Sequence, residues 1–338
     1  MQAAKGEPGG FVSDEARERF LAAYDRGFTL WPGPWTEFDV ETATTTTHVH
    51  RYGPAEGEPA EGGPGGGQRA EDRPAEDRPG GGERAEDGPA GAEPVVLLHG
   101  AGFNGSMWYP NVAALGREHP VFAVDVPGDP NRSVARAPIA EPQASAEWLD
   151  EVLAQVLGEL GADRAHLVGA SYGGWIALNQ ALHAPGRVAS ITLLDPAGLT
   201  PLDWRFWWWF WVRGLAALPP RPLRRRLAAW LGEPTLAENE IIALMWAGTR
   251  TYRMEAKFPR VLTDDELRRI DVPVLLLTGR HSALISPREA RDRASLMPDA
   301  RAEVVTGSRH GPGLEQAGPV NERITAFIAA ATGNRARR

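Results

Sequence analysis

The chain has 338 residues, of which 42% are hydrophobic and 24% are charged, a composition typical of a protein with a large buried core. It contains no Cys, which excludes disulfides, thiolate metal sites and a cysteine nucleophile. The formal net charge is −8, and residues 53–94 alone contribute four Arg against eight Glu and three Asp, a net charge of −7. The rest of the chain is nearly neutral, so the charge pattern does not indicate nucleic-acid binding.

The N-terminal part of the chain, residues 1–52, predicts one helix and two strands. Apolar residues at helical spacing predict a helix over Asp14–Arg26, and Thr-rich alternation predicts strands over Thr36–Thr42 and Thr45–Tyr52. The opening residues lack the layout of a secretory signal, and no apolar run reaches 18 residues. We therefore expect a cytoplasmic protein.

Residues 53–94 form a low-complexity segment built only from Gly, Pro, Ala, Glu, Asp, Arg and Gln. Such a composition cannot bury enough apolar surface to offset the entropy lost on ordering, so we predict a disordered insert. Structured elements are predicted on both sides of it. The insert is therefore interpreted as an enlarged surface turn between strands, where added length costs little free energy.

Residues 95–198 and 263–332 show short apolar runs that alternate with helical patterns. This alternation predicts an α/β fold with a mostly parallel, doubly wound sheet and helices on both faces. The predicted strands are Pro94–Leu98, Val121–Val126, Ala165–Val168, Val188–Asp195, Val272–Thr278 and Ala302–Thr306. The predicted helices are Ala146–Leu160, Gly173–His183 and Glu315–Ala331, and residues 333–338 are expected to be a tail.

Residues 199–262 interrupt this alternation with a helix-like, Arg-rich and aromatic stretch. The pattern predicts a helical cap inserted between two strands. Its run of Trp and Phe residues over 204–211 is interpreted as the aromatic lining of a cap above an apolar pocket. Contact with a membrane surface is the alternative, because Trp and Arg favour interfaces.

The sequence Gly169-Ala170-Ser171-Tyr172-Gly173 lies directly between a predicted strand and a predicted helix. This is the context of a G-x-S-x-G nucleophile elbow, where small residues allow a sharp turn that lifts the Ser hydroxyl above the sheet. The following helix points its first N–H groups toward the same place, which favours a developing negative charge. Ser171 is therefore the candidate nucleophile.

A second motif, His99-Gly100-Ala101-Gly102-Phe103, follows the strand predicted at Pro94–Leu98. In this arrangement the loop supplies one oxyanion N–H group and the residue after the nucleophile supplies the other. The expected donors are Ala101 and Tyr172, with Gly102 or Phe103 replacing Ala101 if the loop is offset. Four nearby residues are expected to contact the substrate: Gly102, Phe103, Trp108 and His281.

The candidate general base is His310, which follows the last predicted strand and precedes the final helix. A base in this position can reach the Ser171 hydroxyl above the C-terminal edge of a parallel sheet. His281 is the rival candidate, but the base comes last in chain order in this arrangement. His281 is therefore interpreted as part of the wall beside the site.

These motifs together resemble the α/β-hydrolase superfamily, and more closely a group of bacterial carboxylesterase-like members. The matching stretches include LHGAGFNGSMWYPNV, VFAVDVPGDPNRS, HLVGASYGGW, LTDDELRRIDVPVLLLTGRHS and EVVTGSRH. The resemblance implies an α/β-hydrolase fold and a serine hydrolase with Ser171 as nucleophile and His310 as base.

The chain departs from the family pattern at the position of the catalytic acid. The family's acid usually ends a G-x-x-D or G-x-x-E motif, whereas this chain has Ser282 there and no carboxylate from Gly279 to Pro287. Asp195, at the end of the strand predicted over Val188–Asp195, is the candidate replacement, because some superfamily members take their acid from this strand. A polar strand end without a catalytic role is the alternative interpretation of Asp195. Two further carboxylates beside the elbow rank below it: Asp125 and Asp129.

The favoured function is hydrolysis of carboxylic esters with small or hydrophobic acyl groups through an acyl-enzyme. A hydrolase-fold ligand-binding protein that has lost its acid, and a C–C hydrolase or lyase on the same fold, remain alternatives. No cofactor or metal is expected, because the chain has no Cys, no HExxH motif and no tight His/Asp cluster in the sequence. The expected partner is a small-molecule ester, and the sequence gives no indication of oligomeric state.

Overall fold

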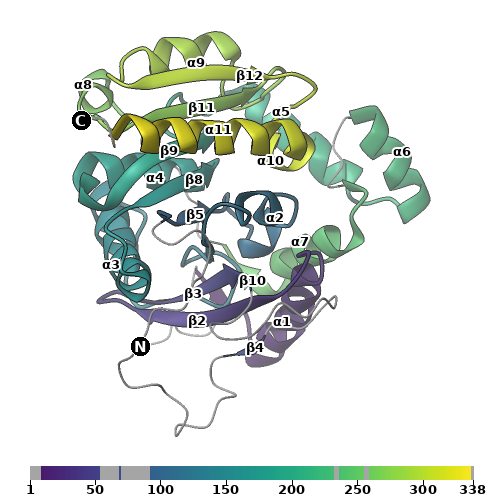
Figure 1. The fold of residues 1–338 in the computed structure, drawn as a ribbon. Coiled ribbons are helices and arrows are strands. Elements are labelled where there is room, and N and C mark those ends of the chain that lie inside the picture. The colour runs from purple at the N-terminus through teal and green to yellow at the C-terminus, as the bar shows by residue number, and fades with distance from the viewer. Residues whose placement is uncertain (1–8, 54–67, 70–91, 232–235, 255–258, 336–338) are drawn as a thin grey trace, which may run out of the picture.

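The protein is described by a computed structural model that covers residues 9–53, 68–69, 92–231, 236–254 and 259–335 (Figure 1). Most of the insert expected at 53–94 lies outside these residues, as do residues 336–338 of the expected tail. The strands are β1 (Gly10–Phe11), β2 (Trp35–Glu41), β3 (Thr45–Tyr52), β4 (Gln68–Arg69), β5 (Val95–Leu98), β6 (Val121–Val124), β7 (Val134–Ala135), β8 (Ala165–Ala170), β9 (Val188–Leu194), β10 (Tyr252–Arg253), β11 (Val274–Gly279) and β12 (Ala300–Val305).

The helices lie between these strands and on both faces of the sheet (Figure 1). They are α1 (Asp14–Phe28), α2 (Val112–Leu115), α3 (Pro142–Leu160), α4 (Tyr172–His183), α5 (Trp204–Ala216), α6 (Arg221–Leu231), α7 (Asn239–Thr251), α8 (Asp264–Arg268), α9 (Pro287–Ala294), α10 (Pro312–Glu315) and α11 (Ala317–Arg335). Short 3₁₀ helices cover Gly105–Trp108 and Pro185–Arg187.

The main sheet has the strand order β12-β11-β9-β8-β5-β6-β3-β2-β4, with β7 paired to β3. All pairs from β12 to β6 are parallel, whereas β3 runs antiparallel to both β6 and β2. The expected mostly parallel sheet is therefore confirmed, with the N-terminal hairpin as its antiparallel part. This topology brings the loops after β5, β8, β9, β11 and β12 to one edge of the sheet.

The central strands are buried on both faces, which explains their continuous apolar sequences. In β5, Val96 and Leu98 belong to one core cluster, whereas Val95 and Leu97 belong to the other. Successive residues of a strand point to opposite faces, so one short run supplies both cores. The first core contains buried residues of α3, α4 and α9, and the second contains those of α1 and α11.

Most predicted elements end within a few residues of their observed bounds, and three differences are notable. The helix predicted at Glu315–Ala331 is divided at Gln316 into α10 and α11, and α11 continues to Arg335 into the expected tail. Strand β9 ends at Leu194, so Asp195 is the first residue beyond it. The antiparallel pair β1–β10 was not predicted, because each strand has only two residues.

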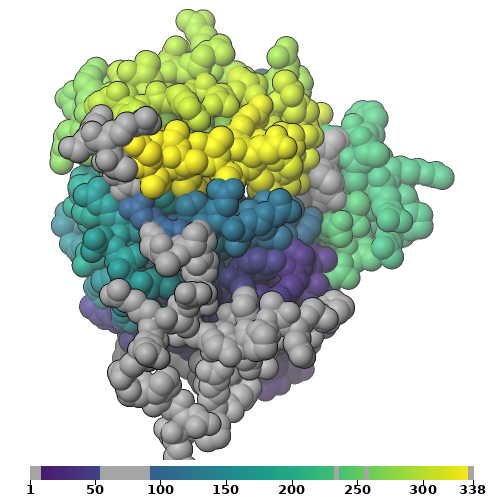
Figure 2. Space-filling model, in the orientation of Figure 1, coloured from purple at the N-terminus to yellow at the C-terminus, as the bar shows by residue number. Residues whose placement is uncertain are grey.

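Helices α5, α6 and α7 follow β9 in the chain and precede β11. The α7 helix packs against α1, and β10 pairs with β1, so the N-terminal segment holds the end of this helical region. The α6 helix stands out from the side of the molecule (Figure 2). We keep the name cap for residues 199–262.

Candidate active site

Ser171 occupies a sharp turn between β8 and α4, with a φ of 49° and a ψ of −111°. Its backbone N–H donates to the Leu194 carbonyl at 3.0 Å, which ties the turn to the end of β9. The flanking glycines are required by space: a Cβ on Gly173 would lie 2.1 Å from the Leu98 oxygen, and one on Gly169 would lie 2.4 Å from the Gly173 oxygen. The small residues of the motif therefore permit a close crossing of backbones under a strained serine.

Asp195 shares this unusual backbone conformation, with a φ of 45°. Ser171 and Asp195 are the two non-glycine residues with positive φ in the described part of the chain. The Asp195 side chain is fully buried, and its Oδ1 accepts hydrogen bonds from Thr278 Oγ1 at 2.7 Å and Gly279 N at 3.2 Å. The carboxylate thus reaches across the end of β11, the strand that usually precedes the acid.

His310 lies in the loop between β12 and α10, and its Nδ1 is 3.2 Å from Asp195 Oδ2. Glu315 holds this loop: its carboxylate accepts from the Ser308 hydroxyl at 2.9 Å, from the Gly311 amide at 2.8 Å and from the Arg309 amide. The Trp209 ring of the cap meets the imidazole edge-on, with ring centroids 4.9 Å apart. The imidazole is therefore positioned by the core and covered by the cap.

Ser282, at the usual position of the acid, has a different structural use. It is buried, and its Oγ accepts from the amides of Leu284 at 3.1 Å and Ile285 at 3.3 Å. Its own amide donates to the Gly279 carbonyl, which closes the turn after β11. The serine stabilises the loop that carries the Gly279 amide to Asp195.

The loop after β5 passes beside the elbow, and a Cβ on Gly100 would lie 3.4 Å from the Ser171 Cβ. Two of its amides are already used: Gly102 N donates to Asp129 Oδ1 at 3.0 Å, and Phe103 N donates to the Gly100 carbonyl at 3.2 Å. Among the described residues, the Ala101 amide has no hydrogen-bond partner. Ala101 therefore stays the predicted loop donor ahead of Gly102 and Phe103.

His99 and two carboxylates fix the shape of this loop. His99 Nε2 accepts from the Val126 amide at 2.8 Å, and its Nδ1 lies 2.9 Å from the Gly100 carbonyl, so the proton is on Nδ1. Asp125 accepts from the Gly105 amide at 2.8 Å and from the Tyr24 hydroxyl at 2.6 Å. Asp125 and Asp129 therefore support the loop, while Asp195 contacts the imidazole.

A pocket of about 260 Å³ contains Ser171 and His310 in its wall. Phe103 and Trp108 line it, whereas Gly102 is not among its lining residues. His281 was expected in the wall of this site, and that prediction is wrong. The residue is exposed and lines a different depression with Arg280. The His281 amide donates to the Ser308 carbonyl, so its loop follows β12 on a course that leaves the side chain outside.

The aromatic run of α5 divides between two environments. Phe206, Trp209 and Phe210 line the pocket, which agrees with the expected aromatic lining. Trp204 and Trp208 instead face solvent, with 74% and 68% of their surface exposed. None of the described helices is both long and apolar enough to cross a membrane.

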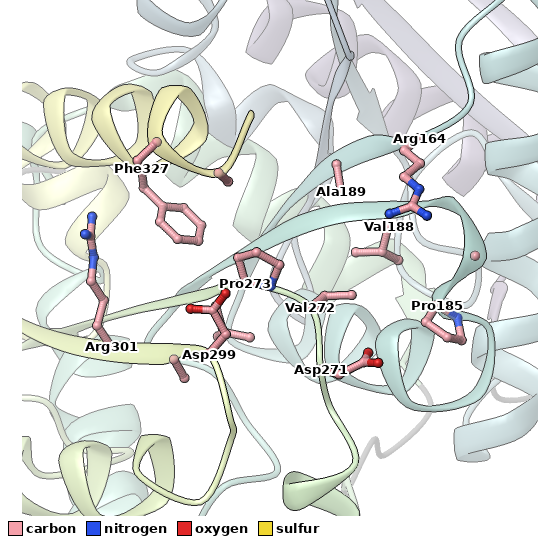
Figure 3. A pocket seen from close by; sticks show the side chains of 15 residues that line it. Arg164, Pro185, Val188, Ala189, Asp271, Val272, Pro273, Asp299, Arg301 and Phe327 are labelled. Atoms are coloured by element: carbon pink, nitrogen blue, oxygen red, sulfur yellow. The ribbon is translucent and has the colours of Figure 1, made fainter. Parts of the chain in front are cut away.

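A second cavity, of about 530 Å³, lies at the opposite edge of the sheet, near the amino ends of β9, β11 and β12 (Figure 3). Arg301, Asp299 and Phe327 are among the side chains around it. The Ser171 pocket, at the carboxyl ends of the strands, is smaller but contains the nucleophile and the base. We therefore assign the candidate active site to the smaller pocket.

Several supporting residues were not identified from the sequence. Thr278 and Glu315 carry no motif of their own, because their contacts depend on the ends of neighbouring strands. The sequence also did not reveal a group of Glu37, His48 and His50, which have ligand-type atoms within 4.8 Å of one another. Pairing of β2 with β3 brings them together, which the separate strand patterns did not reveal.

Comparison with known proteins agrees with this geometry. A family model described as "Alpha/beta hydrolase family" matches residues 95–323. The chain belongs to the alpha/beta hydrolase family. The predicted family and fold are therefore confirmed, and the matched region of this hydrolase begins at β5 and contains the elbow, Asp195 and His310.

Relatives similar over nearly the whole chain come from Bacillus subtilis (strain 168). The uncharacterized carboxylesterase nap is 32% identical over 93% of this chain and 94% of its own length. Carboxylesterase YbfK is 30% identical over 94% of this chain and 96% of its own length. The crystal structure of naproxen esterase from Bacillus subtilis has a TM-score of 0.71 at 30% identity, covering 94% of this chain and 99% of that chain. The expected resemblance to carboxylesterase-like members is thus confirmed.

Proposed function

We propose that this hydrolase cleaves carboxylic esters through an acyl-enzyme, with Ser171 as nucleophile, His310 as base and Asp195 as the residue that orients His310. The observation that carries the proposal is the 3.2 Å contact between His310 Nδ1 and the buried Asp195 carboxylate, beside a strained serine in the same pocket. The carboxylesterase relatives support the same reaction.

In the proposed first step, His310 Nε2 accepts the Ser171 proton while Ser171 Oγ attacks the ester carbonyl. Asp195 accepts a hydrogen bond from the Nδ1–H group of His310, which keeps the lone pair on Nε2 and stabilises the imidazolium. The amides of Ala101 and Tyr172 donate to the oxyanion that forms. His310 then gives this proton to the alcohol oxygen as the ester C–O bond breaks, which leaves the acyl-enzyme. In the second half, His310 accepts a proton from the water that attacks the acyl-enzyme carbonyl, and returns it to Ser171 Oγ as the acid leaves.

The electrostatics of Asp195 suit this use. A buried carboxylate is costly unless it is hydrogen-bonded, and the Thr278 hydroxyl and the Gly279 amide both donate to Oδ1. Oδ2 is then the oxygen that faces His310. The binding-protein alternative rested on the missing carboxylate at Ser282, and the contact of Asp195 with His310 weakens that reason.

The pocket supports a preference for hydrophobic esters. Its wall includes Phe103, Trp108, Phe206 and Trp209, and its volume of about 260 Å³ is near the lower end for small-molecule sites. Apolar surface buried against these rings favours binding by roughly 25 cal/mol per Å². We infer that the acyl or alcohol group is compact and apolar or aromatic.

The test is hydrolysis of short-chain and medium-chain p-nitrophenyl esters by wild type and matched variants. We expect Ser171→Ala to abolish acyl-enzyme formation and Asp195→Asn to lower kcat by ~10⁴-fold, as loss of the orienting acid does in Ser-His-Asp enzymes. Asp163→Asn, an exposed carboxylate before β8, is the control and should match wild type.

The Ser282→Asp variant distinguishes a site in which Asp195 is the catalytic acid from a site that has lost its acid. If Asp195 is the acid, the new carboxylate brings no gain, because the turn loses the hydroxyl that binds two amides. An inert wild type that becomes active with Ser282→Asp, or an Asp195→Asn variant as active as wild type, would refute the assignment.

A further inference from the structure

Four polar side chains share one face of the antiparallel pair β2–β3. Glu37 is the register partner of His50, and Asp39 is the register partner of His48. Residues two apart on a strand point to the same face, so the sequences Glu-Phe-Asp and His-Val-His place two carboxylates opposite two imidazoles. Neither the nucleophile, the base nor the proposed acid belongs to this group.

Three of these side chains converge on a small volume. His48 Nε2 lies 3.3 Å from Glu37 Oε2, and His50 Nδ1 lies 3.9 Å from the same oxygen. All three residues are less than a tenth exposed. Ligands about 2.0–2.2 Å from a shared ion lie roughly 3–4 Å from one another, so only small shifts would bring these atoms to bonding distance.

The outer nitrogens of both imidazoles are already engaged. His48 Nδ1 lies 2.6 Å from Asp39 Oδ1. His50 Nε2 lies 2.6 Å from the Tyr24 hydroxyl oxygen, and that hydroxyl donates its proton to Asp125 Oδ2. Tyr24 therefore accepts from His50 Nε2–H, which places the lone pair of His50 on Nδ1.

His50 Nδ1 is buried and has no hydrogen-bond partner among the described residues. Metal-binding histidines have this arrangement: the outer N–H is donated to a carboxylate or similar acceptor, and the inner lone pair faces the ion. A buried imidazole nitrogen with no partner is otherwise costly.

We propose that Glu37, His48 and His50 bind a divalent transition-metal ion. Two imidazoles and one carboxylate suit Zn²⁺ best, with a fourth position for water. The nearby carboxylates of Asp39 and Asp125 add negative charge that favours a dication. Its role is structural: it joins β2 and β3, and through Tyr24 and Asp125 it braces the start of the Gly105–Trp108 helix beside the oxyanion loop.

Protonation of His48 competes with metal binding at this site. Burial disfavours a charged His48, but the hydrogen bonds to Asp39 and Glu37 outweigh burial and raise the pKa of His48 to about 9. An ion-free protein would therefore hold His48 as a cation between two carboxylates. Metal binding must displace that proton, and the proton released on metal uptake measures this displacement.

The experiment is a titration of chelator-treated full-length protein with Co²⁺ and Zn²⁺, followed by visible absorption, calorimetry and thermal unfolding. We expect uptake of one equivalent of Co²⁺ with proton release and a tetrahedral spectrum, displacement of Co²⁺ by Zn²⁺, and a raised Tm. His48→Gln and His50→Gln should lose this uptake. His183→Gln, an exposed histidine at the end of α4, should retain it.

Asp39→Asn tests the outer hydrogen bond and should weaken affinity by about 10–100-fold without removing a ligand. Absence of stoichiometric uptake by the folded wild type would overturn the proposal. Unchanged uptake in folded His48→Gln and His50→Gln would overturn it as well. If these variants do not fold, the wild-type titration alone decides.

A separate observation concerns the solvent face of α5. Trp204, Trp208, Trp211 and Leu215 follow the spacing i, i+4, i+7 and i+11, so they form one stripe along the helix. Their exposed fractions are 74%, 68%, 66% and 62%. We call these four residues the aromatic stripe. A contiguous exposed apolar surface of this kind marks an interaction site.

The next helix, α6, adds positive charge. Arg221, Arg225 and Arg226 are exposed, and Trp230 is 78% exposed on the same short helix. The α6 helix contains no acidic residue. Helices that combine exposed Trp with Arg bind the interface of anionic lipid bilayers, where the rings enter the headgroup region and the guanidinium groups meet phosphates.

We infer that α5 and α6 dock on an anionic lipid surface. The exposed Arg side chains of α6, a helix without acidic residues, complement the negative charge of this surface. Because Phe206, Trp209 and Phe210 of α5 line the pocket, docking would bring its mouth close to the lipid. If the proposed esterase function also holds, esters dissolved in the bilayer would be its substrates.

The test is co-sedimentation with phosphatidylglycerol–phosphatidylcholine vesicles and with pure phosphatidylcholine vesicles, together with sedimentation velocity. We expect salt-sensitive binding to the anionic vesicles only, lost in Trp208→Ser/Trp211→Ser and reduced in Arg225→Gln/Arg226→Gln. Arg288→Gln, 88% exposed on α9, is the control. Hydrolysis of soluble p-nitrophenyl esters should be unchanged in all of them, which separates this inference from the esterase assignment.

Two results would overturn the lipid inference. One is no binding to anionic vesicles. The other is a concentration-dependent dimer that disappears in Trp208→Ser/Trp211→Ser, which would assign the aromatic stripe to self-association.

Discussion

The loops around Ser171 and the α5 helix above them differ in which kinds of side chain they bury and which they expose. In the core, Asp195 and Thr278 are fully buried polar residues, and the Asp195 carboxylate is held by neighbouring groups. In the cap, Trp204 and Trp208 are large apolar residues that face solvent. The core thus fixes the chemistry by close packing, while the cap has surface still available for substrate or partner.

The largest difference between the two regions should follow from adding one methyl group to a glycine in each. Gly173→Ala would place a Cβ 2.1 Å from the Leu98 oxygen, whereas Gly214→Ala in α5 meets no atom within 4 Å. We expect Gly173→Ala to lower the free energy of unfolding by about 3 kcal/mol and to abolish ester turnover. Gly214→Ala should raise stability by about 0.5–1 kcal/mol, because Ala favours a helix interior. Urea unfolding measures both, and equal effects would contradict the contrast.

The next effect concerns the support of the acid. Thr278→Val keeps the shape of the side chain but removes the donor to Asp195 Oδ1. Leaving a buried carboxylate oxygen with fewer donors costs about 1–3 kcal/mol, so we expect kcat to fall roughly 5–150-fold. Thr332→Val, which removes only a hydroxyl bonded to a carbonyl of its own helix, should leave kcat unchanged. Steady-state kinetics on p-nitrophenyl esters gives the answer; equal kcat values would count against Asp195.

A smaller effect is expected from the cap. Trp209 lines the pocket and meets the His310 ring, whereas Trp204 does neither. Trp209→Leu should raise KM for hydrophobic esters about 10-fold, since it removes roughly 1–1.5 kcal/mol of apolar and ring contact. Trp204→Leu should leave KM for soluble esters unaltered. Comparable KM values in both variants would mean that α5 does not separate the two environments.

The smallest effect is pH-dependent and lies where the cap returns to the core. Hydrogen bonds from Arg260 lower the pKa of Glu266 to about 2, against an ordinary value of 4.5. A depressed pKa contributes stability above pH 4.5 that is lost as the pH falls toward 2. The pair is partly exposed, so we expect less than about 1 kcal/mol. Glu266→Gln should remove this acid-sensitive part of the unfolding curve, whereas Asp265→Asn, on a 92% exposed side chain, should keep it.

The elbow and the base were predictable because each is a local pattern. Gly169 and Gly173 around Ser171 are needed for a turn that the flanking strand and helix already define. The same reasoning gave the parallel strands, since a strand buried on both faces must be apolar at every position. The late position of His310 followed from chain order in the family, and the structure places it 3.2 Å from Asp195.

The errors have a common physical cause, which is that side-chain direction depends on neighbours distant in sequence. His281 was expected in the pocket wall, but the backbone pairing of its loop with Ser308 leaves it outside. His48 and His50 belong to no sequence motif, and only their register with Glu37 and Asp39 brings them into a buried cluster.

By itself the sequence determined the family, the sheet with its elbow, and a short set of candidates for each chemical role. These features depend on local periodicity, on glycines at a tight crossing and on the order of motifs along the chain. The tertiary structure decided which carboxylate meets His310, which amide of the 99–103 loop is available, and which face of α5 is exposed. Each of those depends on the pairing of strands and the packing of loops far apart in the chain. Local sequence patterns do not specify contacts between such distant residues.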